Sequence, residues 1–244
     1  MYLRAAHVEK DVAVLQQLIR DNPLGILTTA IRSENAPFIQ CSHIPFLLDT
    51  PDTNEGAHGI LRGHMAKQNP QAKVLMECIN HTTLDLPDEV LVLFTGPHHH
   101  YVTPQFYTAT KPQTGKVVPT WNYAAVQVYG KIRVYCDSKA DETGAFLQRQ
   151  ISDLSRYAES AIMAYSSPWG VADAPAPYIE MLKKNIIGIE IRIDRLEGKF
   201  KMSQELGKAD RDGVVNGFMD LGTDLGLGMA KAVKERGDKK DSEG

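Results

Sequence analysis

The sequence is poor in cysteine and has no long apolar run. Its three cysteines, Cys41, Cys78 and Cys136, are far apart and form no C-x-x-C pair, so we expect neither a disulfide framework nor a thiolate zinc site. No stretch approaches the ~18 consecutive apolar residues that cross a bilayer. The amino terminus, MYLRAAHVEKD, lacks the apolar segment of a secretory signal. We therefore expect a cytoplasmic protein that does not associate with membranes.

A basic excess is also absent. The chain carries 27 Lys and Arg against 30 Asp and Glu, a net charge of −3, whereas an autonomous nucleic-acid-binding domain usually has a pI above about 9. We find no helix-turn-helix pattern, zinc-finger spacing or basic helix, and we do not expect direct DNA binding. The sequence also has no nucleophile elbow, Walker loop or H-E-x-x-H motif, so we assign no catalytic residue.

The first half of the chain has the pattern of a short helix followed by β-strands. Apolar residues at helical spacing predict a helix from Val12 to Ile19 that ends at the breaker Asp21-Asn22-Pro23. Segments rich in Val, Ile, Leu, Thr and Tyr then predict strands at 24–31, 38–48, 59–65, 90–96 and 122–135. Their close spacing favours antiparallel pairing in a barrel or sandwich, which predicts a β-rich α+β fold.

The second half interrupts the sheet with helices and then returns to strands. We expect helices at 143–163 and 178–182, strands at 186–193 and 198–202, and a helical stretch from Asp210 that the glycines after Leu221 weaken. Because no linker separates the late strands from the earlier ones, we predict one domain over 1–232 with a helical insertion at about 140–184. The mixed-charge segment 233–244 is expected to be a solvated tail.

Three blocks carry candidate binding residues, and the first is LRGHMAKQNP at 61–70. Arg62 can offer a bidentate fork to a phosphate, Lys67 a mobile charge, and Gly63 a close approach of the backbone. A helix beginning after His64 would add free backbone N–H groups. Arg62 and Lys67 could equally be solvent-facing ends around a strand.

The second block, TGPHHHYVTP at 95–104, follows an apolar strand and holds three adjacent histidines. Consecutive residues of an extended chain point alternately to opposite faces, so His98, His99 and His100 should not converge on one ion. No carboxylate or cysteine stands nearby at a ligand spacing, and we predict no metal site. His98, beside the Gly-Pro turn, is the histidine that we expect to face a pocket, next to Thr95.

The third block, VPTWNY at 118–123, places aromatic rings between amide and hydroxyl groups. Trp121 and Tyr123 could stack on a flat heteroaromatic ligand while Asn122 reads its polar edge. A Trp/Tyr corner of the core is the alternative interpretation.

Together these blocks resemble the PaiB-type family of FMN-binding "negative transcriptional regulators". The matching segments include DNPLGIL, LRGHMAKQNPQ, VLFTGPHHHYVTPQFY, GKVVPTWNYAAVQVYG, SPWGVADAP, IIGIEIRIDRLEGKFKMSQ and ADRDGVV, in family order from Met1 to about Gly217. This chain departs from the pattern at His98-His99-His100, where the family often has a single histidine, and at Glu205, where the family has Asn.

The resemblance implies a split β-barrel related to pyridoxamine-phosphate oxidase-like flavoproteins, a homodimer, and FMN bound between subunits. It implies FMN contacts from Arg62, Gly63, His64 and Lys67 at the phosphate, and from Thr95, His98, Trp121, Asn122 and Tyr123 near the flavin ring or the dimer seam.

Three functions remain open. The first is a small FMN-dependent redox enzyme, a reductase or oxidase acting on an unknown small molecule. The second is a PaiB-type transcriptional regulator or flavin sensor. The third is a haem-binding or haem-degrading split barrel, which would need an axial histidine in a roomy apolar pocket.

Overall fold

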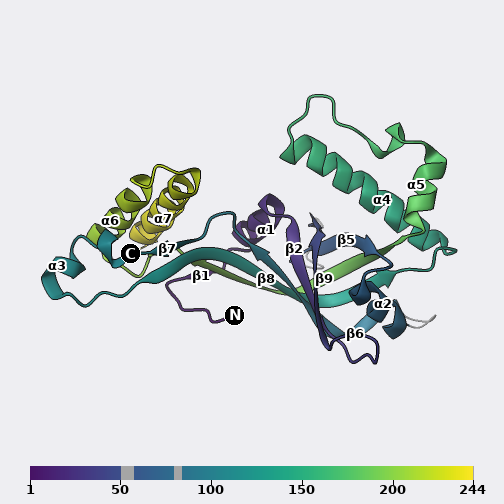
Figure 1. The fold of residues 1–244 in the computed structure, drawn as a ribbon, viewed down its shortest axis with the longest axis horizontal. Helices are drawn as coiled ribbons and strands as arrows, with labels where there is room; N and C mark the ends of the chain where they lie inside the picture. Colours follow the sequence, from purple (N-terminus) through teal and green to yellow (C-terminus); the bar gives the residue numbers. More distant parts are fainter. Residues whose placement is uncertain (51–57, 80–83, 244) are drawn as a thin grey trace. The chain divides into compact units, whose positions relative to one another are not determined.

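The computed structural model describes residues 1–50, 58–79 and 84–243. In chain order the elements are β1 (Val8–Glu9), α1 (Val12–Asp21), β2 (Leu24–Ala30), β3 (Ile39–Pro45), β4 (Leu47–Asp49), β5 (Ile60–Ala66), α2 (Pro70–Cys78), β6 (Asp85–Thr95), β7 (His100–Val102), η1 (Pro104–Phe106), α3 (Thr110–Thr114), β8 (Thr120–Tyr135), α4 (Asp141–Tyr157), η2 (Ala158–Ile162), η3 (Val171–Asp173), α5 (Ala176–Lys183), β9 (Ile186–Lys201), α6 (Lys208–Met219) and α7 (Asp224–Glu243) (Figure 1).

The chain forms two compact units. Unit 1 consists of Met1–Leu18, Thr95–Gln127 and Glu197–Gly244, and unit 2 of Ile19–Phe94 and Val128–Leu196. The long strands β8 and β9 each contribute one part to either unit. Our expectation of a single domain with a helical insertion stays a prediction.

Unit 2 contains the barrel. Its strands are ordered β3-β2-β6-β8-β9-β5-β4, with antiparallel pairing in β2–β3, β2–β6, β5–β9 and β4–β5. The two ends of this order, β3 and β4, are consecutive in the chain and separated only by Phe46. The sheet therefore closes on itself at the Pro45-Phe46 corner. The fold is a β-rich α+β split barrel, as the sequence predicted.

The interior of the barrel is apolar and filled. Phe46 and Phe94 meet edge to face with centroids 6.0 Å apart, and both are essentially unexposed. Other fully buried side chains of this core are Leu27, Ile44, Leu61, Ile132, Ile187, Ile189 and Ile191. Alternate residues of β5 face this core, namely Leu61, Gly63 and Met65. A Cβ on Gly63 would lie 3.0 Å from Ile44 and from Phe46, so the missing side chain of Gly63 is needed for core packing.

Helix α4 covers the other face of β5 and β9. A Cβ on Gly188, which pairs with His64, would lie 2.4 Å from the ring of Phe146 on α4. That ring in turn stacks on Tyr135 with centroids 4.0 Å apart. Helix α5 lies beside α4 (Figure 1). Because Gly188 has no side chain, α4 packs close to the sheet. Polar side chains on this face of β5 are therefore enclosed between the sheet and α4.

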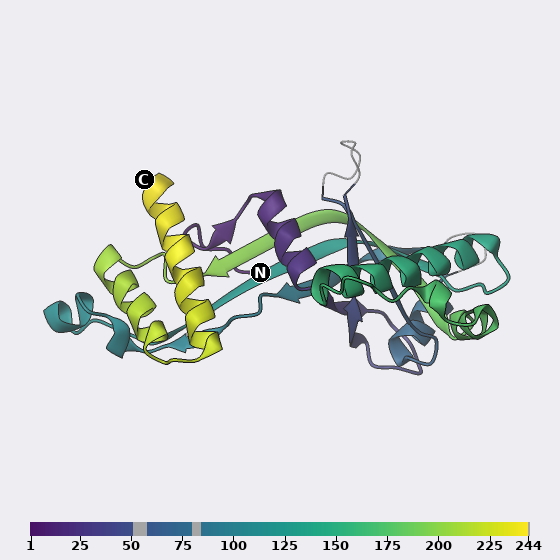
Figure 2. The same cartoon turned by 90° about the horizontal axis from the view of Figure 1, so that it is seen from above.

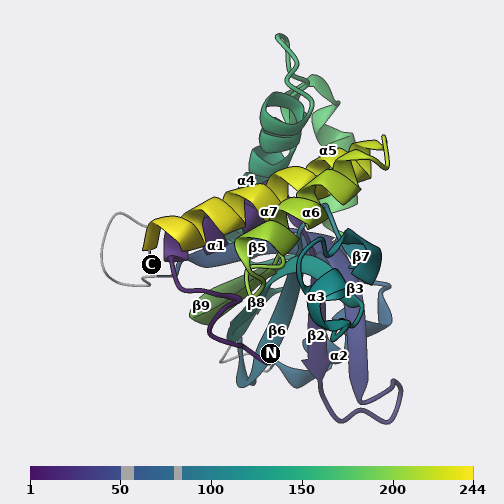
Figure 3. The ribbon, with the colours of Figure 1, turned by 90° about the vertical axis from the view of Figure 1, so that its left-hand side faces the viewer.

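Unit 1 holds the remaining strand pairings and the carboxyl-terminal helices. Strand β7 pairs with β8 and β1 with β9, and α6 and α7 lie side by side (Figures 2 and 3). Residues 233–243, expected to form a solvated tail, continue helix α7 instead.

The residues expected as two late strands, 186–193 and 198–202, lie in the single strand β9, which ends at Lys201. None of the helices, as far as the chain is described, has the length and apolar character to span a membrane.

Candidate functional site

Arg62 lies at the centre of a buried polar network in unit 2. Only 3% of the residue is exposed. Its Nε and Nη2 donate to the two oxygens of Asp49 at 2.5 and 3.0 Å, Nη2 also donates to Asp153 at 3.1 Å, and Nη1 donates to Gln150 at 3.2 Å. Burial opposes the charge on Arg62, but the two carboxylates outweigh it and raise the pKa of the guanidinium. The sequence-predicted phosphate ligand is therefore held in place by the protein itself.

Arg62 also lines a cavity of about 400 Å³. Small-molecule sites typically measure about 300–1,000 Å³, so this volume suits a ligand. The cavity has an apolar side from β4 and its flank and a polar side from α4. Its lining residues are Arg20, Phe46, Leu47, Leu48, Asp49, Arg62, Asp153, Arg156, Tyr157, Ser160 and Ala161. The Tyr157 hydroxyl donates to the Arg20 carbonyl at 2.5 Å, which joins α4 to the end of α1.

His64 occupies the same face of β5 as Arg62, because the two are separated by two positions on a strand. Burial lowers the pKa of His64, which favours the neutral imidazole. Its Nδ1 is buried and has no hydrogen-bond partner among the described residues. A buried polar atom without a partner costs free energy unless water or a ligand satisfies it. His64 thus offers one free ring nitrogen in an enclosed position.

The segment after β5 does not place a helix directly after His64, the case in which free backbone N–H groups would add to an anion site. Strand β5 continues to Ala66, and α2 begins at Pro70, with the Asn69 side chain accepting from the backbone N–H of Gln71. Since Pro70 has no N–H and Asn69 caps Gln71, the start of α2 offers fewer free donors to a phosphate than expected.

Gln71 is the second buried group with an unused atom. It is 2% exposed, and its Nε2 donates to the Leu27 and Gln40 carbonyls and to Thr29 Oγ1. In the part of the chain that the structure describes, its Oε1 has no hydrogen-bond partner. Between His64 and Gln71 in the sequence lies Lys67, whose ammonium forms no hydrogen bond or ion pair with the described residues. The strand-to-helix segment therefore holds a free cation flanked by two unused polar atoms.

Arg62 and Lys67 occupy different positions on this segment, Arg62 within β5 and Lys67 just after its end. Five residues of extended chain span about 16 Å, and side chains an odd number of positions apart face opposite sides of the sheet. We therefore treat the two cations as separate contacts. The prediction that they hold one phosphate stays untested.

The other predicted site residues lie in unit 1. Thr95 is exposed at the end of β6. The ring of His98 packs against Gly228 of α7, where a Cβ would lie 2.5 Å from it. His99 stacks on Trp121 with centroids 6.2 Å apart, and His100 meets Phe218 edge to face at 5.4 Å. The three adjacent histidines thus have three different partners.

Trp121, Asn122 and Tyr123 open strand β8, and they alternate between its faces. Asn122 is fully buried and donates to Ser203 Oγ at 2.9 Å. Trp121 is 51% exposed, and the Tyr123 ring lies 5.3 Å from the ammonium of Lys199. Asn122 therefore secures the loop after β9, whereas the two rings remain available on the opposite face.

Sequence reasoning missed several residues of the unit 2 site. Asp49, Gln150 and Asp153 hold Arg62, and Gln71 offers an unpaired oxygen. The i, i+3 spacing of Gln150 and Asp153 places both on one face of α4, but nothing in the sequence shows which strand that face covers.

Comparison with known proteins agrees with this architecture. Residues 1–195 match the family model described as "Putative FMN-binding domain". An uncharacterized protein of Emericella nidulans is 67% identical over 249 residues, covering 99% of both chains. The "Protease synthase and sporulation protein PAI 2" of Bacillus subtilis is 23% identical over 236 residues, covering 96% of this chain and 95% of its own.

A solved structure shares the fold. The crystal structure of a conserved hypothetical protein from Mycobacterium tuberculosis superposes with a TM-score of 0.50 at 13% identity, covering 85% of this chain and 94% of that chain. The fold and the matched domain define the class as split-barrel proteins of the FMN-binding type. Within that class, the chain belongs to the PaiB-type FMN-binding family.

Proposed function

We propose that this chain binds FMN on the face of β5 that carries Arg62 and His64, and that it is a small flavin-dependent redox enzyme. The observation that carries the proposal is the cavity of about 400 Å³ with the buried Arg62 guanidinium in its wall, in a chain whose residues 1–195 match an FMN-binding domain family. Four of the FMN contacts predicted from the sequence belong to unit 2, as this cavity does, namely Arg62, Gly63, His64 and Lys67.

Polar groups of β5 and of the segment that follows it suit the parts of FMN. The phosphate and ribityl hydroxyls of FMN offer acceptors and donors, which correspond to the Lys67 ammonium and to the unpartnered His64 Nδ1 and Gln71 Oε1. The apolar side of the cavity, from Phe46 to Leu48, suits a flat ring. Arg62 is fixed by two carboxylates, so it can present its edge without losing side-chain freedom on binding.

The electron chemistry would come from the flavin, which accepts and donates electrons or hydride. The chain's own residues would bind and orient it and keep water away, chiefly through α4, which covers this face of the sheet. We assign no catalytic acid or base. We also propose a homodimer in which Thr95, His98, Trp121 and Tyr123 complete the site of a second copy, and an unidentified small-molecule substrate. Asn122, which is buried and bonded to Ser203, would support this site from within its own chain.

The test is titration of the apoprotein with FMN, followed by quenching of flavin fluorescence. Lys67→Met should weaken FMN binding by roughly 10- to 150-fold, as expected for a charge-assisted hydrogen bond worth about 1.5–3 kcal/mol. Lys73→Met, which removes an exposed charge on α2, is the matched control and should bind as the parent does. Arg62→Lys keeps a charge beside Asp49 and Asp153 but loses the fork, and it should also weaken binding.

FMN affinity that is unchanged in both Lys67→Met and Arg62→Lys would refute this placement of the flavin. The absorbance spectrum of the purified protein separates the cofactors, because an oxidised flavin gives paired near-ultraviolet and blue bands and haem gives a Soret band. Reduction of the bound flavin by NADH or NADPH would separate a redox enzyme from a flavin-binding regulator.

A further inference from the structure

Lys199, on β9 within unit 1, is a buried cation without a counter-charge. It lies opposite Val8 of β1, and only 8% of it is exposed. Its ammonium contacts the rings of Tyr123 and Tyr2, with centroids at 5.3 and 5.7 Å, and makes no hydrogen bond or ion pair within the described chain. Lysine is almost never fully buried unless it is paired. Aromatic faces attract an ammonium but accept its hydrogen bonds poorly, so its N–H donors are available to an anion.

The charges around Lys199 are also predominantly positive. Burial lowers the pKa of the neighbouring Lys201, and Lys199 and Arg4 lower it further, while Glu205 opposes them. Two nearby carboxylates are already engaged: Glu205 lies 3.0 Å from His7 Nε2, and Glu197 lies 2.5 Å from the amino terminus.

Lys201 itself bonds only neutral groups among the described residues. It donates to Thr120 Oγ1 and, at 2.9 Å, to the Trp121 carbonyl. Three cations, Arg4, Lys199 and Lys201, therefore gather where a bound anion would relieve their repulsion.

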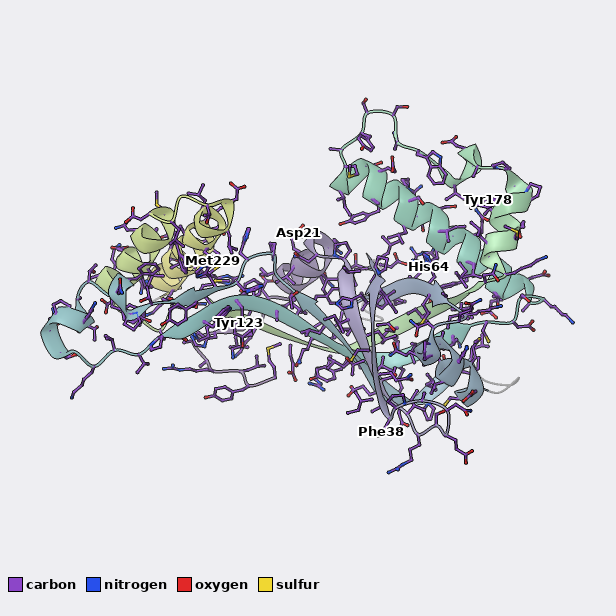
Figure 4. The ribbon with its side chains drawn as sticks, viewed as in Figure 1. Asp21, Phe38, His64, Tyr123, Tyr178 and Met229 are labelled. Atoms are coloured by element: carbon purple, nitrogen blue, oxygen red, sulfur yellow. The ribbon has the colours of Figure 1, made fainter. Side chains whose placement is uncertain are left out.

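Aromatic rings flank these cations on the same face of the strands. Tyr2 is 79% exposed, Trp121 51% and Tyr101 43%, and the Tyr101 and Trp121 rings lie 6.3 Å apart. Trp121 and Tyr123 share one face of β8 because they are two positions apart; Figure 4 labels Tyr123 on this strand. Exposed rings of this kind offer stacking area to a planar heterocycle.

We propose that this face of β8 and β9 in unit 1 binds a nucleotide, whose phosphate is held by Lys199 with Lys201 and Arg4 and whose ring stacks on Tyr2, Tyr123 or Trp121. A phosphate supplies the acceptor oxygens that the Lys199 ammonium lacks. The site lies outside the FMN contacts of unit 2. It uses Trp121 and Tyr123, which the proposed function gives to the flavin of a second copy, and the titration below decides between the two assignments. Two ligands share the required chemistry, a pyridine nucleotide that donates electrons and a flavin nucleotide.

Trp121 provides a local probe of binding. The chain has two tryptophans, Trp121 and Trp169, so Trp169→Phe leaves the emission of Trp121 alone. We expect NADP⁺, ATP or FMN, each titrated separately, to change this emission, with an affinity that falls as salt rises. In the same background Lys199→Met should weaken binding at least about tenfold, because a charge-assisted bond to phosphate is lost. Lys231→Met, at a 77% exposed position on α7, is the matched control and should have no effect.

The arms of the titration identify the ligand. Tighter binding of NADP⁺ than FMN marks a site for the electron donor, and tighter binding of FMN marks a flavin contact. Lys67→Met should leave NADP⁺ binding intact, which separates this inference from the proposed FMN site. If Lys199→Met does not fold, Tyr2→Ala and Arg4→Met must weaken binding instead. Unchanged affinity in these variants, or no response of Trp121 to any of the three nucleotides, would overturn the inference.

Discussion

Glu9 is the residue whose charge holds helix α7 against strand β1 within unit 1. Its carboxylate accepts from the backbone N–H groups of Lys10 and Asp11, from Arg236 at 2.5 Å and from Lys239 at 2.9 Å. Burial acts to raise the pKa of Glu9, but these donors outweigh it and lower the pKa to about 2. The charged segment that the sequence indicated as a tail is therefore anchored by a buried carboxylate.

This shift predicts a pH dependence of stability. Because the folded-state pKa lies below the ordinary value, the Glu9 carboxylate stabilises the fold above about pH 4.5, and the contribution is lost as pH falls toward 2. A shift of this size corresponds to about 3 kcal/mol. Glu9→Gln should lower the free energy of urea unfolding at pH 7 by up to that amount and remove the matching part of the acid destabilisation. Glu235→Gln, at an exposed position of α7, should behave as the parent. Parallel pH profiles for Glu9→Gln and the parent would contradict the prediction.

The sequence alone predicted some of the candidate binding residues and missed others, because the contacts of the missed residues depend on the fold. Arg62 and His64 could be selected because their chemistry suits a ligand and a strand was expected around them. The role of Asp153 could not be foreseen, because it depends on α4 covering β5 across 91 residues of sequence. Asp49 lies only 13 residues before Arg62, but its role depends on the pairing of β4 with β5, which the sequence did not predict. Lys199 was not selected, because the sequence predicts a strand at 198–202 but does not show that this lysine is buried, which only the fold shows.

At the scale of elements, hydrophobic periodicity located most strands to within a few residues. The segment expected at 38–48 is divided into β3 and β4 at Phe46, where the barrel turns its corner. The two late strands form the single strand β9. Within it, Gly198 lets Leu15 of α1 pack directly against the backbone.

Helix α7 is longer than the sequence predicted, although it contains the glycines that we expected to weaken it. Glycine lowers helix propensity, but Gly226 and Gly228 of α7 allow close contact with the Phe218 carbonyl and the His98 ring.

Helix α4 offers an element-scale prediction from two glycines with opposite environments. A Cβ on Gly188 would lie 2.4 Å from Phe146, whereas one on Gly144, within α4, would meet nothing within 4 Å. Gly188→Ala should therefore lower the free energy of unfolding by about 1–3 kcal/mol through overpacking. Gly144→Ala should raise it by up to about 1 kcal/mol through helix propensity. Chemical denaturation measures both.

The same pair tests the coupling of α4 to the ligand. Because α4 forms one side of the cavity beside Arg62, Gly188→Ala should also weaken FMN binding, and Gly144→Ala should not. If Gly188→Ala has the same free energy of unfolding as the parent, the close packing of α4 against β9 at Gly188 is contradicted.

At the scale of the whole molecule, the predicted site residues are divided between the two units. Arg62, Gly63, His64 and Lys67 belong to unit 2, and the remaining predicted contacts belong to unit 1. Both units also leave large apolar side chains at the surface, among them Leu24, Phe38 and Ile39 in unit 2 and Val118 and Trp121 in unit 1. Exposed large apolar side chains mark interaction surfaces where they form a contiguous patch. A homodimer that covers them and completes the flavin site would account for both features.

The proposed dimer predicts a linkage between assembly and flavin occupancy. Obligate interfaces usually bury about 2,000 Å² or more, and a ligand that binds the dimer but not the monomer shifts the equilibrium toward dimer by mass action. Dilution should therefore release flavin, and added FMN should raise the melting temperature. Sedimentation of FMN-loaded protein at micromolar concentration, with absorbance read at the flavin band, measures both quantities at once. A single species of 27.0 kDa with full flavin occupancy would show that one chain is sufficient to hold FMN, since no second copy would then be present to contribute to the site.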